Sequence, residues 1–107
     1  MKIIQKNTSS ITELCVRYHV AELYVFGSVL TERFKKDSDI DFLVRFSFTN
    51  QMEYFDNYMD FKEGLEKIFS RKVDLVEIQT LKNPILKRSI NRDKVIIYGR
   101  ENTKMAV

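Results

Sequence analysis

Residues 25–46, VFGSVLTERFKKDSDIDFLVRF, hold the pattern that decides the fold. An apolar run ends in Gly27-Ser28, ten further residues follow, and Asp39 and Asp41 then flank a single isoleucine where a second apolar run begins. Alternate residues of a β-strand point to the same side, so these two carboxylates are expected side by side. Like charges repel and are costly to bury alone, so the pair indicates that a cation binds between them.

Length and composition indicate one ordinary globular domain. The 107 residues are 44% hydrophobic and 31% charged, which argues against disorder. The single cysteine excludes an intrachain disulfide and a zinc site built on cysteine pairs. A net charge of +3 permits an anionic ligand but is too small to indicate nucleic acid. No apolar run approaches the roughly 18 residues of a membrane span, and the N-terminus turns polar too early for a secretion signal. We therefore expect a cytoplasmic protein.

Predicted helices and strands alternate along the chain. Apolar residues spaced by three and four predict helices over residues 8–20 and 51–70, and helix-start signals predict a third over residues 83–91. Short β-branched and aromatic runs predict strands over 22–27, 39–46, 72–78 and 94–99. This order predicts an α/β domain with a small mixed sheet of about four strands and helices packed on it. We expect residues 1–107 to form a single domain in which residues 99–107 are a frayed tail.

The first and last predicted helices carry recognisable end signals. Ser10 and Glu13 have the spacing of a capping box, and Cys15 falls on the apolar face, which predicts a core thiol rather than a reactive one. Asn83 can cap the last predicted helix, and Pro84 suits the first position of that helix.

The helix over residues 51–70 is the longest, and it has an apolar stripe that we expect to pack on the sheet. The alternative is that part of this stripe spills onto the surface as a partner-binding patch, through Met52, Tyr54 or Phe61. The residues of the predicted stripe are Phe55, Tyr58, Met59, Lys62, Leu65 and Phe69.

A third acid, Asp74, lies inside the apolar run KVDLVEI, where a charge is costly without a partner. Carboxylates on adjacent strands of one sheet can converge, and oxygen-rich sites suit hard divalent cations, Mg²⁺ above all. Each acid also has an ordinary structural interpretation. Asp39 can cap a turn, and Asp74 can pair with Lys72 or a neighbouring arginine.

Gly27-Ser28 provides the complement to the acids. A glycine at a strand end lets the backbone approach a ligand closely. The serine adds a hydroxyl and an N–H at the start of a helical turn, where free N–H groups favour an anion. A Gly-Ser dipeptide by itself indicates only a turn. The information lies in the ordered set of strand, Gly-Ser, ten residues, Asp-Ile-Asp, strand, long helix, and an aspartate within an apolar strand.

That ordered set resembles the nucleotidyltransferase superfamily of DNA polymerase beta type, with its GS…DxD…D signature. It is most similar to the minimal nucleotidyltransferases, which are single small domains of prokaryotes. The segments YVFGS, DSDIDFLV, KVDLVE and NPILKRSINRDKVIIYG fall where that family has its elements, so the resemblance covers nearly the whole chain. It implies the nucleotidyltransferase fold.

The resemblance also implies a role for each motif residue. Gly27 and Ser28 would hold the nucleotide triphosphate. Asp39 and Asp41 would bind two Mg²⁺ ions, and Asp74 would be the third carboxylate, either a metal ligand or a base for the attacking hydroxyl. Two metal ions can stabilise both the incoming and the leaving oxygen of a displacement at phosphorus.

The sequence departs from the family after the Gly-Ser pair. Family members often continue with a small residue, then arginine and glycine, whereas this chain has Thr31 and Glu32 at the last two places. Arg33, Lys35 or Lys36 could replace the arginine, although the alternative is a solvated charged loop. Glu32 adds a negative charge near the expected triphosphate, which predicts reduced activity.

As a function, the resemblance implies a Mg²⁺-dependent enzyme that moves a nucleoside monophosphate from an NTP onto a hydroxyl of a partner protein. The expected NTP is ATP, which would supply AMP, with another NTP as the alternative. A domain this small leaves no room for an acceptor-binding domain, so the partner must complete the cleft. Minimal nucleotidyltransferases are often encoded beside a helical HEPN-type protein in a toxin–antitoxin pair, which implies that this chain is the antitoxin.

Two alternatives remain open at this point. The first is a catalytically weak or inactive module that neutralises its partner by contact through residues 51–70. The second is a transferase acting on RNA or on a small molecule. Scattered basic residues permit RNA, but they fit a solvated helix face better: Lys82, Lys87, Arg88, Arg92 and Lys94.

Overall fold

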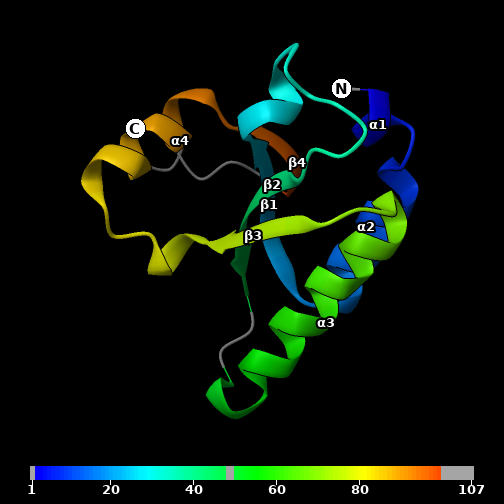
Figure 1. Ribbon diagram of the computed structural model, residues 1–107. Helices are drawn as coiled ribbons and strands as arrows, with labels where there is room; N and C mark the ends of the chain where they lie inside the picture. The colour runs from blue at the N-terminus through cyan, green and yellow to red at the C-terminus, as the bar shows by residue number, and fades with distance from the viewer. Residues whose placement is uncertain (1, 48–49, 100–107) are drawn as a thin grey trace.

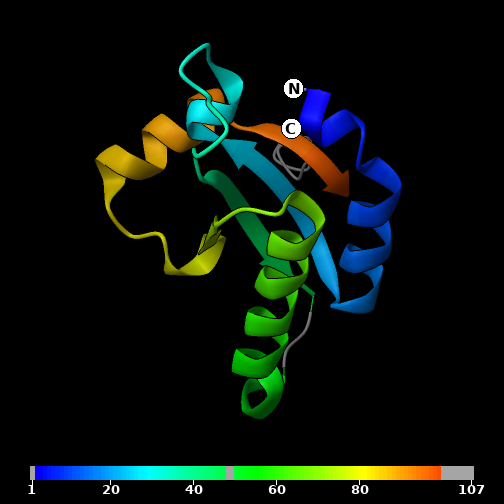
Figure 2. The ribbon, with the colours of Figure 1, turned by 45° about the vertical axis from the view of Figure 1, so that its right-hand side comes forward.

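The computed structural model describes residues 2–47 and 50–99, and within them a four-stranded mixed sheet carries helices on both faces (Figures 1 and 2). The strand order is β3-β2-β1-β4. β1 pairs antiparallel with β2 and β4, whereas β3 pairs parallel with β2. This arrangement confirms the predicted fold class. The strands are β1 (Val20–Phe26), β2 (Ile40–Phe46), β3 (Val73–Glu77) and β4 (Val95–Gly99).

The helices cover the two faces of the sheet unequally. Their bounds are α1 (Lys2–Gln5), α2 (Thr8–Arg17), α3 (Gln51–Phe69) and α4 (Pro84–Asp93), with 3₁₀ turns η1 (Gly27–Leu30) and η2 (Ile78–Thr80). α2 and α3 contribute Cys15, Phe61 and Leu65 to the larger core, where Phe42 also lies. α4 contributes Ile90 to a smaller core on the opposite face. No helix of the described residues is long and apolar enough to cross a bilayer.

The predicted helices and strands are present, although the helix predicted over residues 8–20 ends at Arg17 and Val20 is already the first residue of β1. α1 has no counterpart in the prediction, because its single turn is too short to show a period. The predicted frayed tail lies outside the described residues, except for Gly99, which is the last residue of β4. The turn predicted after the first strand is the 3₁₀ turn η1.

Of the two helix caps predicted from the sequence, one is present and one is not. Asn83 caps α4 as expected, because its side-chain oxygen accepts hydrogen bonds from the N–H groups of Ile85 and Leu86. The predicted capping box at Ser10 is wrong, because α2 already begins at Thr8 and Ser10 is an exposed residue inside it. Cys15 is fully buried as predicted, and burial raises the pKa of its thiol to about 12.

The apolar stripe of α3 is fully buried only in its C-terminal half. Phe61, Leu65 and Phe69 lie in the core, so Phe61 is not part of a surface patch. Met52 is 93% exposed and Phe55 68% exposed, because the first turns of α3 extend beyond the sheet (Figure 1).

The prediction that the whole stripe packs on the sheet is therefore wrong for Phe55 and Met59, whereas Tyr58 packs against the core as predicted. Of the two remaining candidates for a surface patch, Met52 is exposed and Tyr54 is half-buried against the core.

Candidate active site

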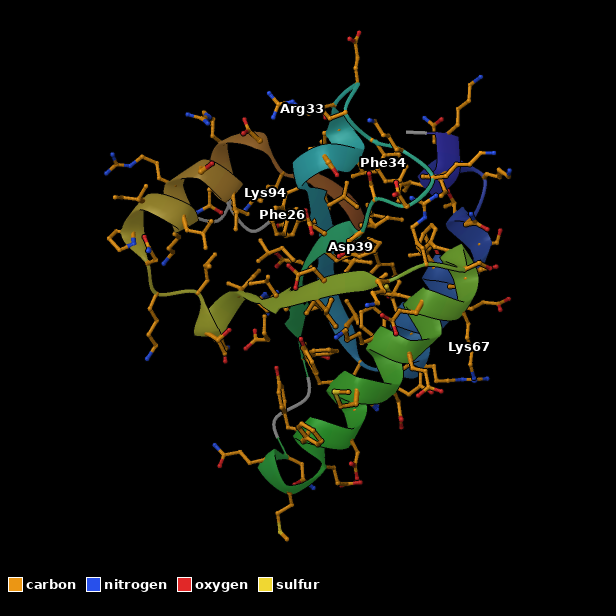
Figure 3. The ribbon with its side chains drawn as sticks, in the orientation of Figure 1. Phe26, Arg33, Phe34, Asp39, Lys67 and Lys94 are labelled. Carbon is orange, nitrogen blue, oxygen red and sulfur yellow. The ribbon has the colours of Figure 1, made fainter. Side chains whose placement is uncertain are left out.

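The strand pairing brings the predicted motif residues together at one end of neighbouring strands, where β1 ends and β2 and β3 begin. Phe26, the last residue of β1, pairs with Asp41, and Asp41 pairs with Asp74 across the parallel β2–β3 contact. Asp39 lies just before β2, near enough to Asp41 for its charge to act on that carboxylate (Figure 3 labels Asp39). Two aspartates on neighbouring strands, Asp41 and Asp74, and a third just before β2 thus gather at the end of the sheet where the Gly27 turn lies.

The acids share one face of the sheet. In β2 the neighbours of Asp41, Ile40 and Phe42, are buried in the core beneath α2 and α3. In β3 the neighbours of Asp74, Val73 and Leu75, lie in that same core. Because strand residues alternate between faces, both carboxylates point to the opposite face, toward the side where α4 packs.

Gly27 lies directly against the carboxylate of Asp41. Its φ is +79°, in the region that glycine adopts without steric cost. A Cβ placed on Gly27 would lie 2.2 Å from Oδ2 of Asp41. Only a residue without a side chain therefore lets the η1 turn approach this acid so closely.

The three acids are coupled electrostatically. The pKa of Asp41 is raised above its usual value, first by burial and then by the negative charges of Asp74 and Asp39. The cation predicted between these acids would remove this repulsion. The structural alternatives for these acids are not seen among the described residues. No ion pair joins Asp74 to Lys72. In the turn before β2, the side chain that accepts a hydrogen bond is that of Ser38, from the N–H of Lys35, and not that of Asp39.

The chemistry of Asp39, Asp41 and Asp74 suits a hard divalent cation, because their carboxylate oxygens carry negative charge that no neighbouring cation balances in the described part of the chain. Within residues 2–47 and 50–99, however, no three His, Cys, Asp or Glu side chains are arranged closely enough to hold a metal ion by themselves. Mg²⁺ commonly uses one or two carboxylates together with substrate phosphates rather than a cage made of protein alone. The geometry therefore fits a cation that is shared with a phosphate ligand.

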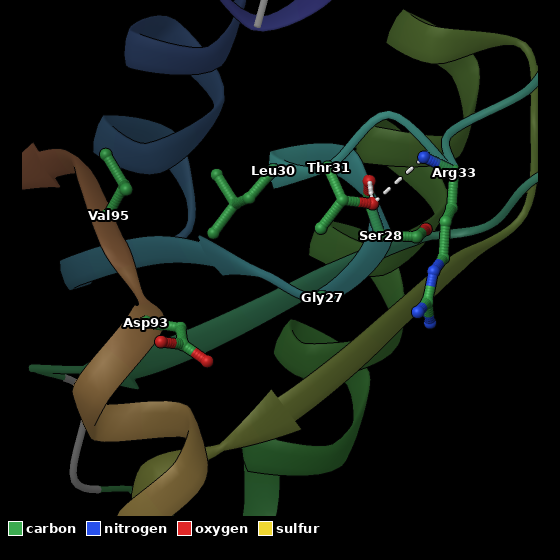
Figure 4. Close-up of a pocket in the computed structure, with 7 residues that line it drawn as sticks. All are labelled: Gly27, Ser28, Leu30, Thr31, Arg33, Asp93 and Val95. Carbon is green, nitrogen blue, oxygen red and sulfur yellow. Dashed lines mark hydrogen bonds between the residues drawn. The ribbon is translucent and has the colours of Figure 1, made fainter.

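An open pocket of about 720 Å³ lies beside the η1 turn (Figure 4). Gly27, which lies against Asp41, is one of its lining residues, whereas Asp39, Asp41 and Asp74 are not. The pocket lies between the η1 turn and the junction of α4 with β4. Its lining residues are Gly27, Ser28, Leu30, Thr31, Arg33, Asp93 and Val95. Both predicted nucleotide-binding residues are therefore pocket residues.

The pocket also revises the expectations for the charged loop. Of the three cations considered as phosphate ligands, Arg33 lines the pocket, whereas Lys35 and Lys36 are not among its lining residues. Glu32 is not among them either, and its expected effect on activity stays a prediction. Sequence reasoning missed Asp93, because only the fold brings the end of α4 next to the η1 turn.

A mixed sheet with a Gly-Ser turn after the first strand and aspartates on the next two is the arrangement that the resemblance to nucleotidyltransferases predicts. The family described as "Polymerase beta, Nucleotidyltransferase" matches residues 9–103 of the sequence, so the chain belongs to that family. It is an enzyme of the nucleotidyltransferase class, and it is similar to the minimal nucleotidyltransferases.

Two proteins with similar sequences support this assignment. A provisionally named protein adenylyltransferase of Methanocaldococcus jannaschii is 36% identical over 81 residues, which is 76% of this chain and 80% of that relative. The protein adenylyltransferase MntA of Thermococcus cleftensis is 37% identical over 75 residues, or 70% of this chain and 73% of MntA.

Solved structures with the same fold include a provisionally assigned minimal nucleotidyltransferase, with TM-score 0.69 and 27% identity over 85% of this chain and 89% of that one. A toxin–antitoxin complex with AMP-PNP has TM-score 0.70 at 18% identity, covering 94% of this chain and 79% of that one. A tri-AMPylated Shewanella oneidensis HEPN toxin in complex with an MNT antitoxin gives TM-score 0.65 at 18% identity, covering 96% and 78%. At 18% identity the likeness establishes the fold alone.

Proposed function

We propose that this chain transfers AMP from ATP, in the presence of Mg²⁺, to a hydroxyl group of a partner protein. The observation that carries the proposal is the contact of the Gly27 turn with Asp41 beside Asp74, next to an open pocket. Two relatives also support the proposal, because they are 36% and 37% identical to this chain and are named as protein adenylyltransferases, one of them provisionally.

In this proposal each motif residue has one task. Backbone N–H groups and the hydroxyl at Gly27-Ser28 hold the triphosphate in the pocket. Asp39 and Asp41 serve as ligands of Mg²⁺, which when bound supplies charge neutralisation at the reacting phosphate. Asp74 is a further ligand, or it accepts the proton of the attacking hydroxyl. These roles follow from the family signature and from the side chains' placement on one face.

The reaction is a displacement at the α-phosphorus of the nucleotide. The partner's hydroxyl oxygen forms a bond to the α-phosphorus, and the bond from that phosphorus to the bridging oxygen of the β-phosphate breaks. Pyrophosphate leaves with the electron pair of the broken bond. The hydroxyl proton passes to Asp74 or to water. The protein contributes chiefly by positioning the two reactants and by stabilising charge.

The partner we propose is a helical HEPN-type toxin, which would make this chain an antitoxin. The support is that protein chains of the same fold occur in complexes with toxins, one of which is an AMPylated HEPN toxin. The acceptor in this proposal is a side-chain hydroxyl of the toxin, with tyrosine as the expected type.

The test compares Asp39→Asn with a matched control, Asp37→Asn, in cells that also express the HEPN protein. Asp37 is an exposed acid of the same loop and lies outside the proposed ligand set. We expect Asp39→Asn to abolish both the added AMP in the mass spectrum of the toxin and the protection of the cells. Asp37→Asn should retain both. Protection by Asp39→Asn without any added AMP would contradict the proposal.

A second candidate function, neutralisation by contact, has one observation in its favour. Met52, Phe55 and Met59 are exposed on α3 at spacings of three and four residues, so they form one apolar stripe on the helix. If contact alone neutralises the toxin, the double variant Met52→Ser, Phe55→Ser should abolish protection, while Asp39→Asn should leave it intact.

A further inference from the structure

The pocket beside the η1 turn has an asymmetric charge. Among its lining residues, Arg33 is the one cation and Asp93 the one anion. Figure 4 shows the two side chains on opposite sides of Gly27, with Arg33 on the side of Ser28. A ligand in this pocket therefore meets a positive group close to the Gly-Ser turn.

The positive charge of Arg33 is available to a ligand. Asp93 is occupied by its neighbour Arg92, whose Nε lies 3.2 Å from Oδ1 of Asp93. In the described part of the chain, no hydrogen bond or ion pair engages the guanidinium of Arg33, which is exposed. An unengaged guanidinium at the wall of a pocket is a ready partner for phosphate oxygens, which it can bind through two parallel hydrogen bonds.

Thr31 fixes the start of the segment that carries Arg33. Its hydroxyl donates to the carbonyl oxygen of Ser28 at 2.9 Å and accepts from the N–H of Arg33 at 3.1 Å (Figure 4). The N–H of Thr31 donates to the same carbonyl at 2.9 Å. One side chain thus ties the Gly-Ser turn to the backbone of the arginine.

The loop is also held beyond Arg33. The guanidinium of Arg71 lies 4.6 Å from the centre of the Phe34 ring. The Nη1 of Arg71 donates to the carbonyl oxygens of Lys35 at 3.0 Å and Ser38 at 2.9 Å. Arg33 therefore lies between two fixed points, which lowers the conformational entropy lost when its backbone is ordered by a ligand.

We infer that Arg33 binds the phosphates of the nucleotide and that Thr31 is the residue that positions it. The inference rests on the proposed function, because it takes the nucleotide to occupy the pocket at Gly27-Ser28. It also gives a structural reason for the departure from the family pattern. Thr31 stands where the family often has an arginine, and its side chain holds the backbone of Arg33, two residues later.

The test measures binding by calorimetry with ATP and AMP, each in the presence of Mg²⁺. Loss of a charged hydrogen-bond partner predicts that Arg33→Ala weakens ATP binding about tenfold, while AMP, with fewer phosphates, changes less. Arg33→Lys should retain part of the affinity. The matched control is Lys36→Ala, an exposed cation of the same loop outside the pocket, which should leave both affinities unchanged.

Thr31 is tested by Thr31→Val, which removes the hydroxyl at similar size, and by Thr31→Ser, which keeps it. We expect weaker ATP binding for valine, by about threefold, and restored binding for serine. Equal ATP affinity of Arg33→Ala and Lys36→Ala would overturn this inference while leaving the proposed function standing. Absence of ATP binding by the unaltered protein would overturn both.

Discussion

Replacement of Gly27 by alanine tests whether the contact between the η1 turn and Asp41 builds the site. Gly27 has a φ of +79°, and an added Cβ would lie 2.2 Å from Oδ2 of Asp41, whereas real Cβ atoms essentially never approach closer than 3.0 Å. Forcing alanine into a left-handed backbone costs about 1–2 kcal/mol, which at this chain length lowers Tm by about 5–15 °C. The clash must also displace the Asp41 carboxylate or the turn itself.

Gly99→Ala is the matched control for backbone strain. Gly99 has a φ of +90°, and its added Cβ would lie 2.1 Å from the carbonyl oxygen of Ala21. It pairs with Glu22 near the start of β1, at the end of the strand opposite to Gly27. Both variants should therefore lose stability, but only Gly27→Ala should disturb the acids.

The assay is thermal unfolding with and without ATP and Mg²⁺. A ligand at about 100 times its dissociation constant adds about 2.7 kcal/mol of stability, so the unaltered protein should show a clear rise in Tm. We expect this rise to persist in Gly99→Ala and to disappear in Gly27→Ala. An equal ligand-induced rise in the two variants would refute the reasoning, because the approach of the turn to Asp41 would then be irrelevant to binding.

Three further predictions concern single side chains. The pKa of Asp41 is raised in the folded protein, so its carboxyl favours folding below its ordinary pKa, and that contribution is lost as the pH rises through the raised pKa. Asp41→Asn should therefore raise Tm at neutral pH without ligand yet abolish the rise caused by ATP and Mg²⁺, and a lower Tm would contradict the assigned repulsion. Asn83→Ala removes the cap of α4 and should lower the free energy of unfolding by about 1 kcal/mol in urea titrations; no change would show that the cap is dispensable. Cys15, with a pKa raised to about 12, should react with thiol reagents only on unfolding, so rapid labelling of the native protein would contradict its burial.

The sequence was sufficient to predict the strands and the acids, because each depends on local patterns. Alternation places Ile40 and Phe42 in the core and Asp41 on the other face, as strand geometry requires. The side-by-side position of Asp41 and Asp74 depends on the parallel register of β2 and β3. The sequence could suggest that convergence, but only the fold provides the register.

The parts that could not be predicted depend on long-range packing. Helical spacing shows which residues of α3 share a stripe but not how far the sheet extends beneath them, so the exposure of Phe55 was missed. The wall of the pocket formed by Asp93 and Val95 depends on where α4 ends relative to η1. The role of Thr31 depends on a hydrogen-bonded turn that its charged neighbours do not reveal.

The most direct test of the account is the fate of labelled phosphate when the protein is mixed with ATP, Mg²⁺ and its HEPN-type partner. ATP labelled on the α-phosphate and ATP labelled on the γ-phosphate are compared in parallel. Nucleotidyl transfer predicts that the α label becomes attached to the partner and that the γ label leaves in pyrophosphate. Attachment of the γ label, or of neither label while the partner is still neutralised, would contradict the account.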